Sequence, residues 1–334
     1  MNFAGQASRW KNSIDMNVID KIENSGFKLA DDEILELLNI DPCSHDFYRL
    51  LSVSNELSRE KFGHKGYVFT QVGINAEPCS KNCRFCSMGF DHYSVDSRWK
   101  KDVETLKAEL FRLQKFLYDD FFLMTTADYP VGQFLDIAGQ LRPMLKKEQR
   151  FVANIGDFDL ETAKELKSAG FTGVYHINRL REGEDTLISP ADRERTIDSA
   201  REAGLELYYC IEPVGPEHAY AELLAEIKRA RDLRISVMAV MRRTSVPGTP
   251  LFHLGRITAL ELTKIAAVTN LVVNPSRAMN VHEPTAMALL AGVNQLYAEV
   301  GANPRDTRSD TENSRGFTPD KAWEMLGEAG YRAF

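Results

Sequence analysis

The sequence predicts an α/β fold: a single (β/α)₈ TIM-type barrel with a helical N-terminal preface and a C-terminal helix. Three observations favour it. Short apolar runs alternate with helical patterns from Tyr67 onward, no break in composition divides the 334 residues, and a cysteine-rich loop directly follows the first apolar run. A doubly wound sheet repeats the same β-α unit and stays an alternative. We expect residues 1–62 to form a helical N-terminal extension and residues 63–334 to form the barrel with its C-terminal loop and helix.

The preface is predicted from residues 15–62, where apolar side chains such as Ile34, Leu38 and Phe47 recur at roughly helical spacing. Lone Cys43, between two of these helices, is expected to be structural. The eight strands are expected at residues 67–74, 120–126, 151–155, 172–176, 205–211, 235–241, 270–274 and 295–300.

Helix boundaries follow from local signals between these strands. Ser189 followed by Pro190 predicts an N-cap and a first helical residue, and Gly170 and Gly204 are typical helix stops. A last helix is expected at residues 319–329. The polar segment 303–316 before it is expected to cover the barrel mouth and exclude water.

Composition limits the possible functions. Hydrophobic residues make up 43% of the chain and charged residues 27%, with a formal net charge of -7, which is ordinary for a globular protein. No block of like charge offers a path for a nucleic-acid backbone, and no apolar run is long enough to span a membrane. The N-terminus lacks a basic region followed by an apolar run. We therefore expect a cytoplasmic protein with a small-molecule substrate, not a nucleic-acid or membrane binder.

The stretch CSKNCRFC holds Cys79, Cys83 and Cys86, three of the five cysteines. Three thiolates on one loop can each ligate one iron of a [4Fe–4S] cluster, leaving the fourth iron open to a small molecule. A zinc site is an alternative that would need His92 as its fourth ligand. A disulfide does not fit three clustered cysteines, and a ferredoxin-type site needs a fourth cysteine, whereas none follows until Cys210.

The CxxxCxxC spacing, with Phe85 before the last cysteine, resembles the signature of radical S-adenosylmethionine (SAM) enzymes. From about residue 66 to 300 the order of motifs is similar to that of the branch with biotin synthase, the [FeFe]-hydrogenase maturase that is a lyase, and methylornithine synthase. The resemblance implies a complete barrel, a [4Fe–4S] cluster on the three cysteines, and SAM bound to the open iron. It also implies reductive release of a 5′-deoxyadenosyl radical, with electrons from a donor such as ferredoxin or flavodoxin.

The resemblance further implies contacts to SAM. A segment after the second strand would contact the amino group of SAM. A polar group and an arginine near the fourth strand would contact the amino acid end of SAM, and apolar strand edges would contact its adenine. Arginines two apart on a helix point nearly opposite ways, so only one of Arg193 and Arg195 can face the barrel mouth, and the family register selects Arg193. The residues expected to contact SAM are Phe85, Thr125, Thr126, Ala127, Asn178, Arg193, Ile211 and Val240.

Polar residues near the predicted strand ends indicate a mouth for a polar, zwitterionic or carboxylate-bearing substrate. Any single member could instead be a satisfied polar group in a loop, and Cys210 could be a core residue. His282 matches the loop in which biotin synthase places an arginine. The expected substrate residues are Asn154, His176, Tyr208, Cys210, Glu212, Asn280 and His282, with Asp157, Arg242 and Glu283 nearby.

Biotin synthase takes sulfur from a second cluster held by three cysteines and an arginine. At the matching points this chain has Leu123, Val152 and Tyr208, with Cys210 two residues further on, and one cysteine cannot hold a [2Fe–2S] cluster. We therefore expect hydrogen abstraction followed by cleavage or rearrangement. The alternatives are a cofactor-assembly role like that of the hydrogenase maturase, sulfur insertion with sulfur from a partner protein, and a non-catalytic iron–sulfur or zinc scaffold.

Overall fold

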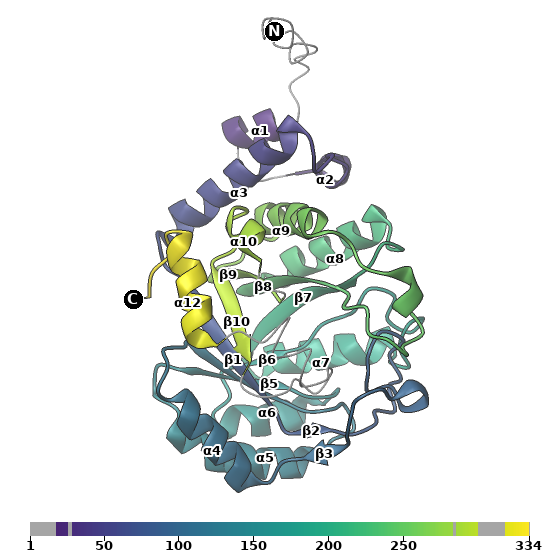
Figure 1. Cartoon of the computed structure of the whole chain (residues 1–334), viewed down its shortest axis with the longest axis vertical. Coiled ribbons are helices and arrows are strands. Elements are labelled where there is room, and N and C mark those ends of the chain that lie inside the picture. Colours follow the sequence, from purple (N-terminus) through teal and green to yellow (C-terminus); the bar gives the residue numbers. More distant parts are fainter. Residues whose placement is uncertain (1–17, 26–28, 283–284, 300–317, 334) are drawn as a thin grey trace, which may run out of the picture.

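A computed structural model describes residues 18–25, 29–282, 285–299 and 318–333 of the chain. Eight parallel strands close into a barrel in the order β1-β10-β9-β8-β7-β6-β5-β4 (Figure 1). This closure confirms the barrel and excludes the doubly wound sheet. The strands are β1 (Tyr67–Gly73), β4 (Asp120–Met124), β5 (Arg150–Asn154), β6 (Gly173–Tyr175), β7 (Glu206–Val214), β8 (Val237–Arg242), β9 (Ala278–Val281) and β10 (Gln295–Glu299).

Helices surround the barrel, and four of the eight named below begin at a polar residue whose side chain caps the first turn. Asp102, Asp159, Thr258 and Thr318 each accept a hydrogen bond from a backbone N–H three residues on, which satisfies one free donor of the helix start. Ser189 occupies the N-cap before α7 as predicted, but its side chain makes no capping bond. The helices are α4 (Val103–Leu113), α5 (Val131–Leu141), α6 (Leu160–Ser168), α7 (Pro190–Glu202), α8 (Tyr220–Leu233), α9 (Ala259–Val273), α10 (Ala286–Leu289) and α12 (Pro319–Glu328).

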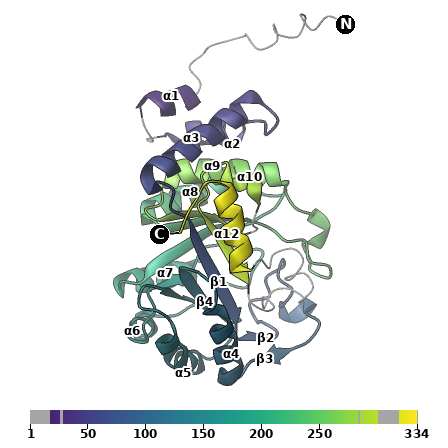
Figure 2. The ribbon, with the colours of Figure 1, turned by 60° about the vertical axis from the view of Figure 1, so that its left-hand side comes forward.

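Three N-terminal helices, α1 (Val18–Ser25), α2 (Asp31–Leu38) and α3 (His45–Phe62), lie beside α9 on one side of the barrel (Figures 1 and 2). The amide of Asn270 on α9 donates to the backbone oxygen and hydroxyl of Ser54 and to the hydroxyl of Ser58, at 3.0 to 3.1 Å. These buried bonds fix α3 against the barrel layer. Cys43 lies exposed in the turn between α2 and α3.

The prediction of a strand at residues 270–274 is wrong. These residues form the end of α9, and the seventh strand of the barrel is β9, further along the chain. Every residue from Leu262 to Val273 is buried, because α9 lies between the barrel and α3. A helix covered on both sides has no polar face, so its sequence resembles that of a buried strand.

A small antiparallel pair, β2 (Asn75–Ala76) with β3 (Trp99–Lys100), was not predicted. It joins the two ends of the segment that carries the cysteines. Single 3₁₀ turns follow at Phe90–His92, Arg142–Met144 and Phe252–Leu254. The expected cover at residues 303–316 lies outside the described residues. In the described part of the chain, no helix combines the length and apolarity needed to cross a membrane.

Candidate active site

The cysteine loop is held by its own backbone. The amide of Cys79 donates to the carbonyl of Met88 at 2.8 Å, and the amide of Cys86 donates to that of Cys83 at 2.9 Å. The Nε2 atom of His92 lies 3.1 Å from the carbonyl oxygens of both Cys83 and Cys86. Because carbonyl oxygens only accept, Nε2 is the donor here. His92 therefore supports the loop from behind, which argues against its role as a zinc ligand.

Two carboxylates tie the loop to the rest of the barrel mouth. Asp128, in the loop after β4, accepts hydrogen bonds from the amide and hydroxyl of Ser80, the latter at 2.6 Å. Asp185, in the loop after β6, pairs with the guanidinium of Arg84 at 3.0 Å, and its backbone oxygen accepts from the Arg84 amide. The loop is thereby held near both ends by contacts to other parts of the chain.

All three cysteines line one cavity at the carboxyl ends of the strands, where barrel enzymes place their reacting groups. The other lining residues come from the cysteine loop, from the ends of β4, β5 and β6, and from the start of α7. They are Lys81, Met88, Met124, Thr125, Thr126, Ala127, Asn154, Ile155, Gly156, Tyr175, His176, Ile177, Arg179, Ile188 and Arg193. The three residues Thr125 to Ala127 thus line the same cavity as the cysteines, and their contact with SAM stays a prediction.

The donor set fits a cluster with three protein ligands. Burial raises the pKa of the Cys83 thiol to about 12, although Arg179 partly offsets this, and burial also raises the pKa of Cys79. Without a metal these groups therefore stay protonated at neutral pH, and a bound metal must displace the protons. The other two cysteines cannot join, since Cys43 is exposed on the surface and Cys210 is buried in the barrel interior.

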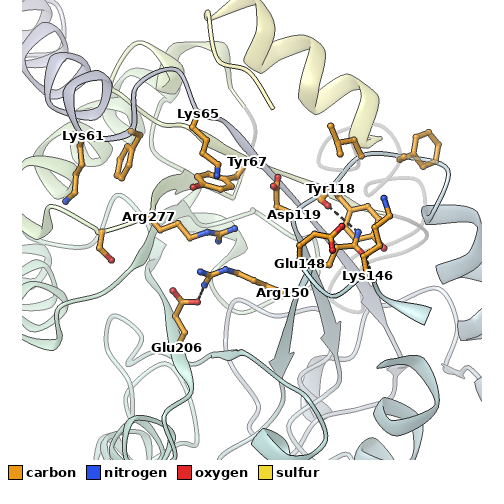
Figure 3. A pocket seen from close by; sticks show the side chains of 15 residues that line it. Lys61, Lys65, Tyr67, Tyr118, Asp119, Lys146, Glu148, Arg150, Glu206 and Arg277 are labelled. Atoms are coloured by element: carbon orange, nitrogen blue, oxygen red, sulfur yellow. Dashed lines mark hydrogen bonds and ion pairs between the residues drawn. The ribbon is translucent and has the colours of Figure 1, made fainter. Parts of the chain in front are cut away.

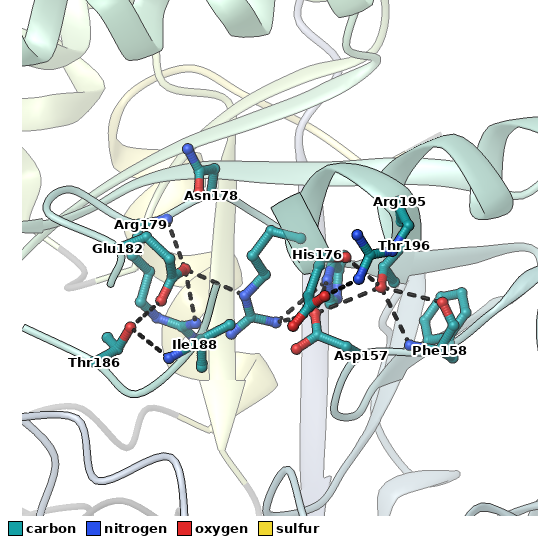
Figure 4. Close-up of polar contacts among 12 residues, drawn as sticks. Asp157, Phe158, His176, Asn178, Arg179, Glu182, Thr186, Ile188, Arg195 and Thr196 are labelled. Carbon is teal, nitrogen blue, oxygen red and sulfur yellow. Dashed lines mark hydrogen bonds and ion pairs between the residues drawn. The ribbon is translucent and has the colours of Figure 1, made fainter. Parts of the chain in front are cut away.

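A buried polar network lies beside the cysteines, drawn in Figure 4. The guanidinium of Arg193, only 5% exposed, donates to Asp157 at 3.0 Å and to Glu182 at 3.2 Å. Arg195 instead points to solvent, where it pairs with Asp192. The structure thus turns Arg193 toward the cavity and Arg195 away from it, as the helical spacing requires.

The network sets the charge of His176. Burial lowers the pKa of His176 to about 4, even though its hydrogen bond to Asp157 opposes the shift. The neutral ring donates from Nε2 to Asp157 at 3.0 Å. Burial alone would raise the pKa of Asp157, but this bond and the charge of Arg193 lower it to about 2. At neutral pH the network therefore holds a neutral imidazole beside a carboxylate and a guanidinium.

Arg179 was missed at the sequence level. Its partly buried guanidinium lies 3.2 Å from Glu212, and it lines the cysteine cavity. Burial would lower the pKa of Arg179, but Glu212 and Glu182 raise it above its ordinary value, so the group stays charged. A signal was present, because Arg179 directly follows Asn178 in the loop after β6, where barrel enzymes place functional side chains.

Deeper in the barrel, three predicted substrate residues meet. The sulfur of Cys210, a carboxylate oxygen of Glu212 and a ring nitrogen of His282 all lie within 4.8 Å of one another. Glu212 is 2% exposed and accepts a hydrogen bond from the hydroxyl of Tyr175 at 2.8 Å. Asn280, two residues before His282 on the same strand face, is also buried, and its amide donates to Gln295 at 3.4 Å. Asn154 and His176 lie higher, in the cysteine cavity.

Tyr208 does not belong to this group, contrary to expectation. Its hydroxyl donates to Asp120 at 3.3 Å, at the amino end of β4, and Asp120 is also bound by Arg277 and Gln295. These side chains fill the opposite end of the barrel. The placement failed because residues along one strand face lie at different depths, which the sequence pattern does not reveal.

Other predictions were wrong about direction. The amide of Asn178 donates outward to Glu226 of α8 at 3.4 Å. Ile211 pairs in register with Val240, and Cys210 and Glu212 on either side of Ile211 face inward, so both apolar side chains face the helices. Leu123 faces outward for the same reason, since its neighbours Phe122 and Met124 face inward. Further out, Phe85 is not among the residues that line the cavity, Arg242 donates to the backbone of Ile257, and Glu283 lies outside the described residues.

A second cavity, of about 780 Å³, lies at the amino ends of the strands (Figure 3). Within its lining, Arg150 pairs with Glu206, whereas Arg277 pairs with Asp120 of the barrel interior. It contains no cysteine. The residues are Lys61, Phe62, Lys65, Tyr67, Phe116, Leu117, Tyr118, Asp119, Lys146, Glu148, Gln149, Arg150, Glu206, Ser276 and Arg277. Although larger, this cavity lies at the end of the barrel that usually serves stability, so we place the reacting site at the cysteines.

No protein-family model matches the chain. Among curated proteins, it is 24% identical to the biotin synthase of Clostridioides difficile (strain 630) over 262 residues, covering 74% of this chain and 78% of the relative. It is 25% identical to the biotin synthase of Desulforudis audaxviator (strain MP104C) over 310 residues, covering 87% of this chain and 90% of the relative.

Two solved structures share the barrel. Methylornithine synthase (PylB) superposes with a TM-score of 0.81 at 17% identity, covering 95% of this chain and 97% of that one. HydG, a maturase of the [FeFe]-hydrogenase, superposes with a TM-score of 0.77 at 18% identity, covering 94% of this chain and 74% of that one. These likenesses show the fold. The biotin synthase relatives and the three-cysteine loop after β1 support a radical SAM, biotin-synthase-like family for this chain, with a [4Fe–4S] cluster and SAM as its cofactors.

Proposed function

We propose that the chain abstracts hydrogen from a small polar substrate, amino-acid-like or carboxylate-bearing, and that cleavage or rearrangement of the substrate follows. The observation that carries the proposal is the ion pair of partly buried Arg179 with fully buried Glu212 beside the cysteine cavity. Buried charges are costly unless they are paired. A zwitterionic substrate could replace each partner with one of its own charged groups, so it would be bound without leaving either residue uncompensated.

Arg193 is proposed to hold the carboxylate of SAM. Its Nε and Nη1 atoms are already oriented by Glu182 and Asp157, which leaves the rigid guanidinium with Nη2 toward a ligand. Thr125 to Ala127 are proposed to accept from the SAM ammonium through backbone oxygens. When bound, the cluster and SAM together supply one-electron reduction and the abstraction of a hydrogen atom. The surrounding side chains orient SAM and keep its charged end in place.

Sulfur insertion of the biotin type is less well supported. It needs a sulfur source inside the barrel, and the inward side chains at the matching depth of β4 and β5 are Phe122 and Val152. Among the five cysteines of the chain, only Cys210 lies in the barrel interior. One thiol does not hold a [2Fe–2S] cluster. A sulfur-inserting reaction would therefore require sulfur from a second protein.

We also propose an external one-electron donor such as ferredoxin or flavodoxin. Support comes from the outer edge of the cysteine loop, where Phe90 is 67% exposed and the side chain of Arg84 is half exposed. An exposed aromatic residue and a cation beside the cysteines suit a brief contact with an acidic redox protein.

The test is anaerobic turnover of reconstituted protein with dithionite and SAM, followed by quantification of 5′-deoxyadenosine. Perdeuterated amino acids and dicarboxylic acids are then added singly, and the true substrate is expected to raise the rate and transfer deuterium into 5′-deoxyadenosine. Cys86→Ser should abolish product, whereas Cys43→Ser, at an exposed cysteine outside the site, should not. A fully loaded cluster that binds SAM but yields no 5′-deoxyadenosine would refute catalysis and favour a scaffold.

A further inference from the structure

We propose that Cys210, Glu212 and His282 form a second metal site inside the barrel, for a single divalent transition-metal ion such as Zn²⁺ or Fe²⁺. The three residues supply a thiolate, a carboxylate and an imidazole, which together suit ions of this class. The Cys79, Cys83 and Cys86 set is separate from them. The inference rests on where the backbone places these side chains.

The register of the strands brings the three donors together. Cys210 and Glu212 are two residues apart on β7 and therefore share the inner face. His282 directly follows β9, and the strand between them, β8, has Ala239 in register with Cys210. Because an alanine side chain is a single methyl group, space is left over β8 across which donors from β7 and β9 can approach each other.

The distances are close to those of a loaded site. All three donor atoms lie within 4.8 Å of one another, and Nδ1 of His282 is 4.0 Å from the nearer oxygen of Glu212. With metal–sulfur and metal–nitrogen bonds of about 2.3 and 2.0 Å, tetrahedral ligands are roughly 3.3 to 3.6 Å apart. The three ligand atoms must therefore come about an ångström closer to one another, which rotation of their side chains can provide while the strands keep their places.

The surroundings resemble the outer shell of a metal site. Tyr175 donates to Glu212 at 2.8 Å, and Arg179 lies 3.2 Å from the other oxygen of that carboxylate. Such second partners orient a ligating carboxylate and are typical of metal sites. Cys210 is fully buried and the side chain of His282 is 15% exposed. A divalent ion with a thiolate and a carboxylate is neutral overall, so its burial carries little electrostatic cost.

A three-ligand site leaves one coordination position open. The Oδ1 atom of Asn280 is buried with no hydrogen-bond partner among the described residues, and the register places Asn280 beside Ala239 on the inner face. It could accept from a metal-bound water. Tyr175 and Arg179 also line the cysteine cavity, so the open position lies next to it. If the proposed function holds, the substrate's carboxylate would occupy that position next to Arg179, and its ammonium group would pair with the Glu212 oxygen that does not ligate the metal.

The test measures metal content of the full chain, reconstituted anaerobically and then incubated with Zn²⁺ and desalted. We expect one zinc per chain in addition to four irons, with the cluster's electron paramagnetic resonance signal intact. Cys210→Ala and His282→Ala should each lose the zinc but keep the cluster signal and the far-ultraviolet circular dichroism of the parent. Cys43→Ala, the matched control at an exposed cysteine, should keep the zinc. Absence of bound zinc in the parent, or its retention in both interior variants, would overturn the proposal.

Zinc-edge X-ray absorption of the same sample gives a check that does not depend on variant folding. The site predicts one sulfur scatterer at about 2.3 Å with nitrogen and oxygen in the remaining positions. Two or more sulfurs would mean that zinc has entered the cysteine loop, which would refute the assignment. Production of 5′-deoxyadenosine is scored separately, so failure of the proposed reaction and failure of this site are distinguishable.

Discussion

Gly156, in the loop after β5, lies against the backbone of Ala127 in the loop after β4. A Cβ atom added there would lie 2.3 Å from the backbone oxygen of Ala127, and 3.1 Å from two further backbone atoms of the same residue. Ordinary contact needs about an ångström more, and the obstacle is backbone, so the loops must separate. Overpacking of this kind typically costs about 1 to 3 kcal/mol of unfolding free energy. We therefore expect Gly156→Ala to be destabilised by that amount.

The same displacement should weaken SAM binding, because Ala127 belongs to the segment proposed to hold the SAM ammonium. The amide of Thr125 donates to the backbone of Asn154 at 3.0 Å, so the segment moves with its neighbour. An affinity loss of at least about tenfold, or about 1.4 kcal/mol, is expected. The assay is anaerobic calorimetric titration of reconstituted protein with SAM, together with urea unfolding of the same variant.

Gly139 provides the matched control. It is exposed within α5, and a Cβ atom there meets nothing within 4 Å. Gly139→Ala should therefore stabilise the helix by about 0.5 to 1 kcal/mol and leave SAM affinity unchanged. If Gly156→Ala binds SAM as tightly as the parent, or if both variants change alike, the reasoning about the two loops is wrong.

Three further predictions concern charged and titrating groups. Arg193→Met should abolish measurable SAM binding and destabilise the protein by about 3 to 5 kcal/mol, because it leaves buried carboxylates unpaired. The control Arg195→Met, at an exposed position, should change stability by less than about 0.5 kcal/mol. In the metal-free protein at pH 8, iodoacetamide should label exposed Cys43 far faster than Cys83, whose pKa of about 12 keeps it a thiol. Burial lowers the pKa of His176 from 6.5 to about 4, so stability should be full above pH 6.5 and fall as the pH drops toward 4, by about 2 kcal/mol at pH 5.

Each of these has a contrary outcome. Equal SAM affinity in the Arg193 and Arg195 variants would remove the assigned carboxylate contact. Equal labelling of the two cysteines by mass spectrometry would show that Cys83 is not buried in the metal-free chain. In urea unfolding of the metal-free protein, the free energy of unfolding should fall less between pH 7.5 and pH 5 after His176→Gln than in the parent. An equal fall in both proteins would place the titrating group elsewhere.

The sequence carried enough to predict the barrel and the cysteine loop, because alternating elements and clustered thiols are local signals. It failed where the environment decides. Residues 270–274 were assigned to a strand because α9 is buried on both sides and has no polar face. The sequence also did not predict how deep in the barrel a side chain lies or which way it points. Tyr208 lies on the correct face at the wrong end of the barrel, and Ile211 lies on the wrong face, since a strand boundary alone does not tell which residue points inward. The orientation of Arg193 toward the cavity could be predicted because helical geometry allowed only one of two choices, and its contact with SAM stays a prediction.

The attachment of the cysteine loop to Asp128 and Asp185 bears on how the protein recovers from air. The two carboxylates and the ring of His92 bind Ser80, Arg84 and backbone carbonyls of the loop, and none of them uses a cysteine sulfur. We therefore expect that a cluster lost to oxidation can be rebuilt from iron, sulfide and a reductant without breaking these contacts.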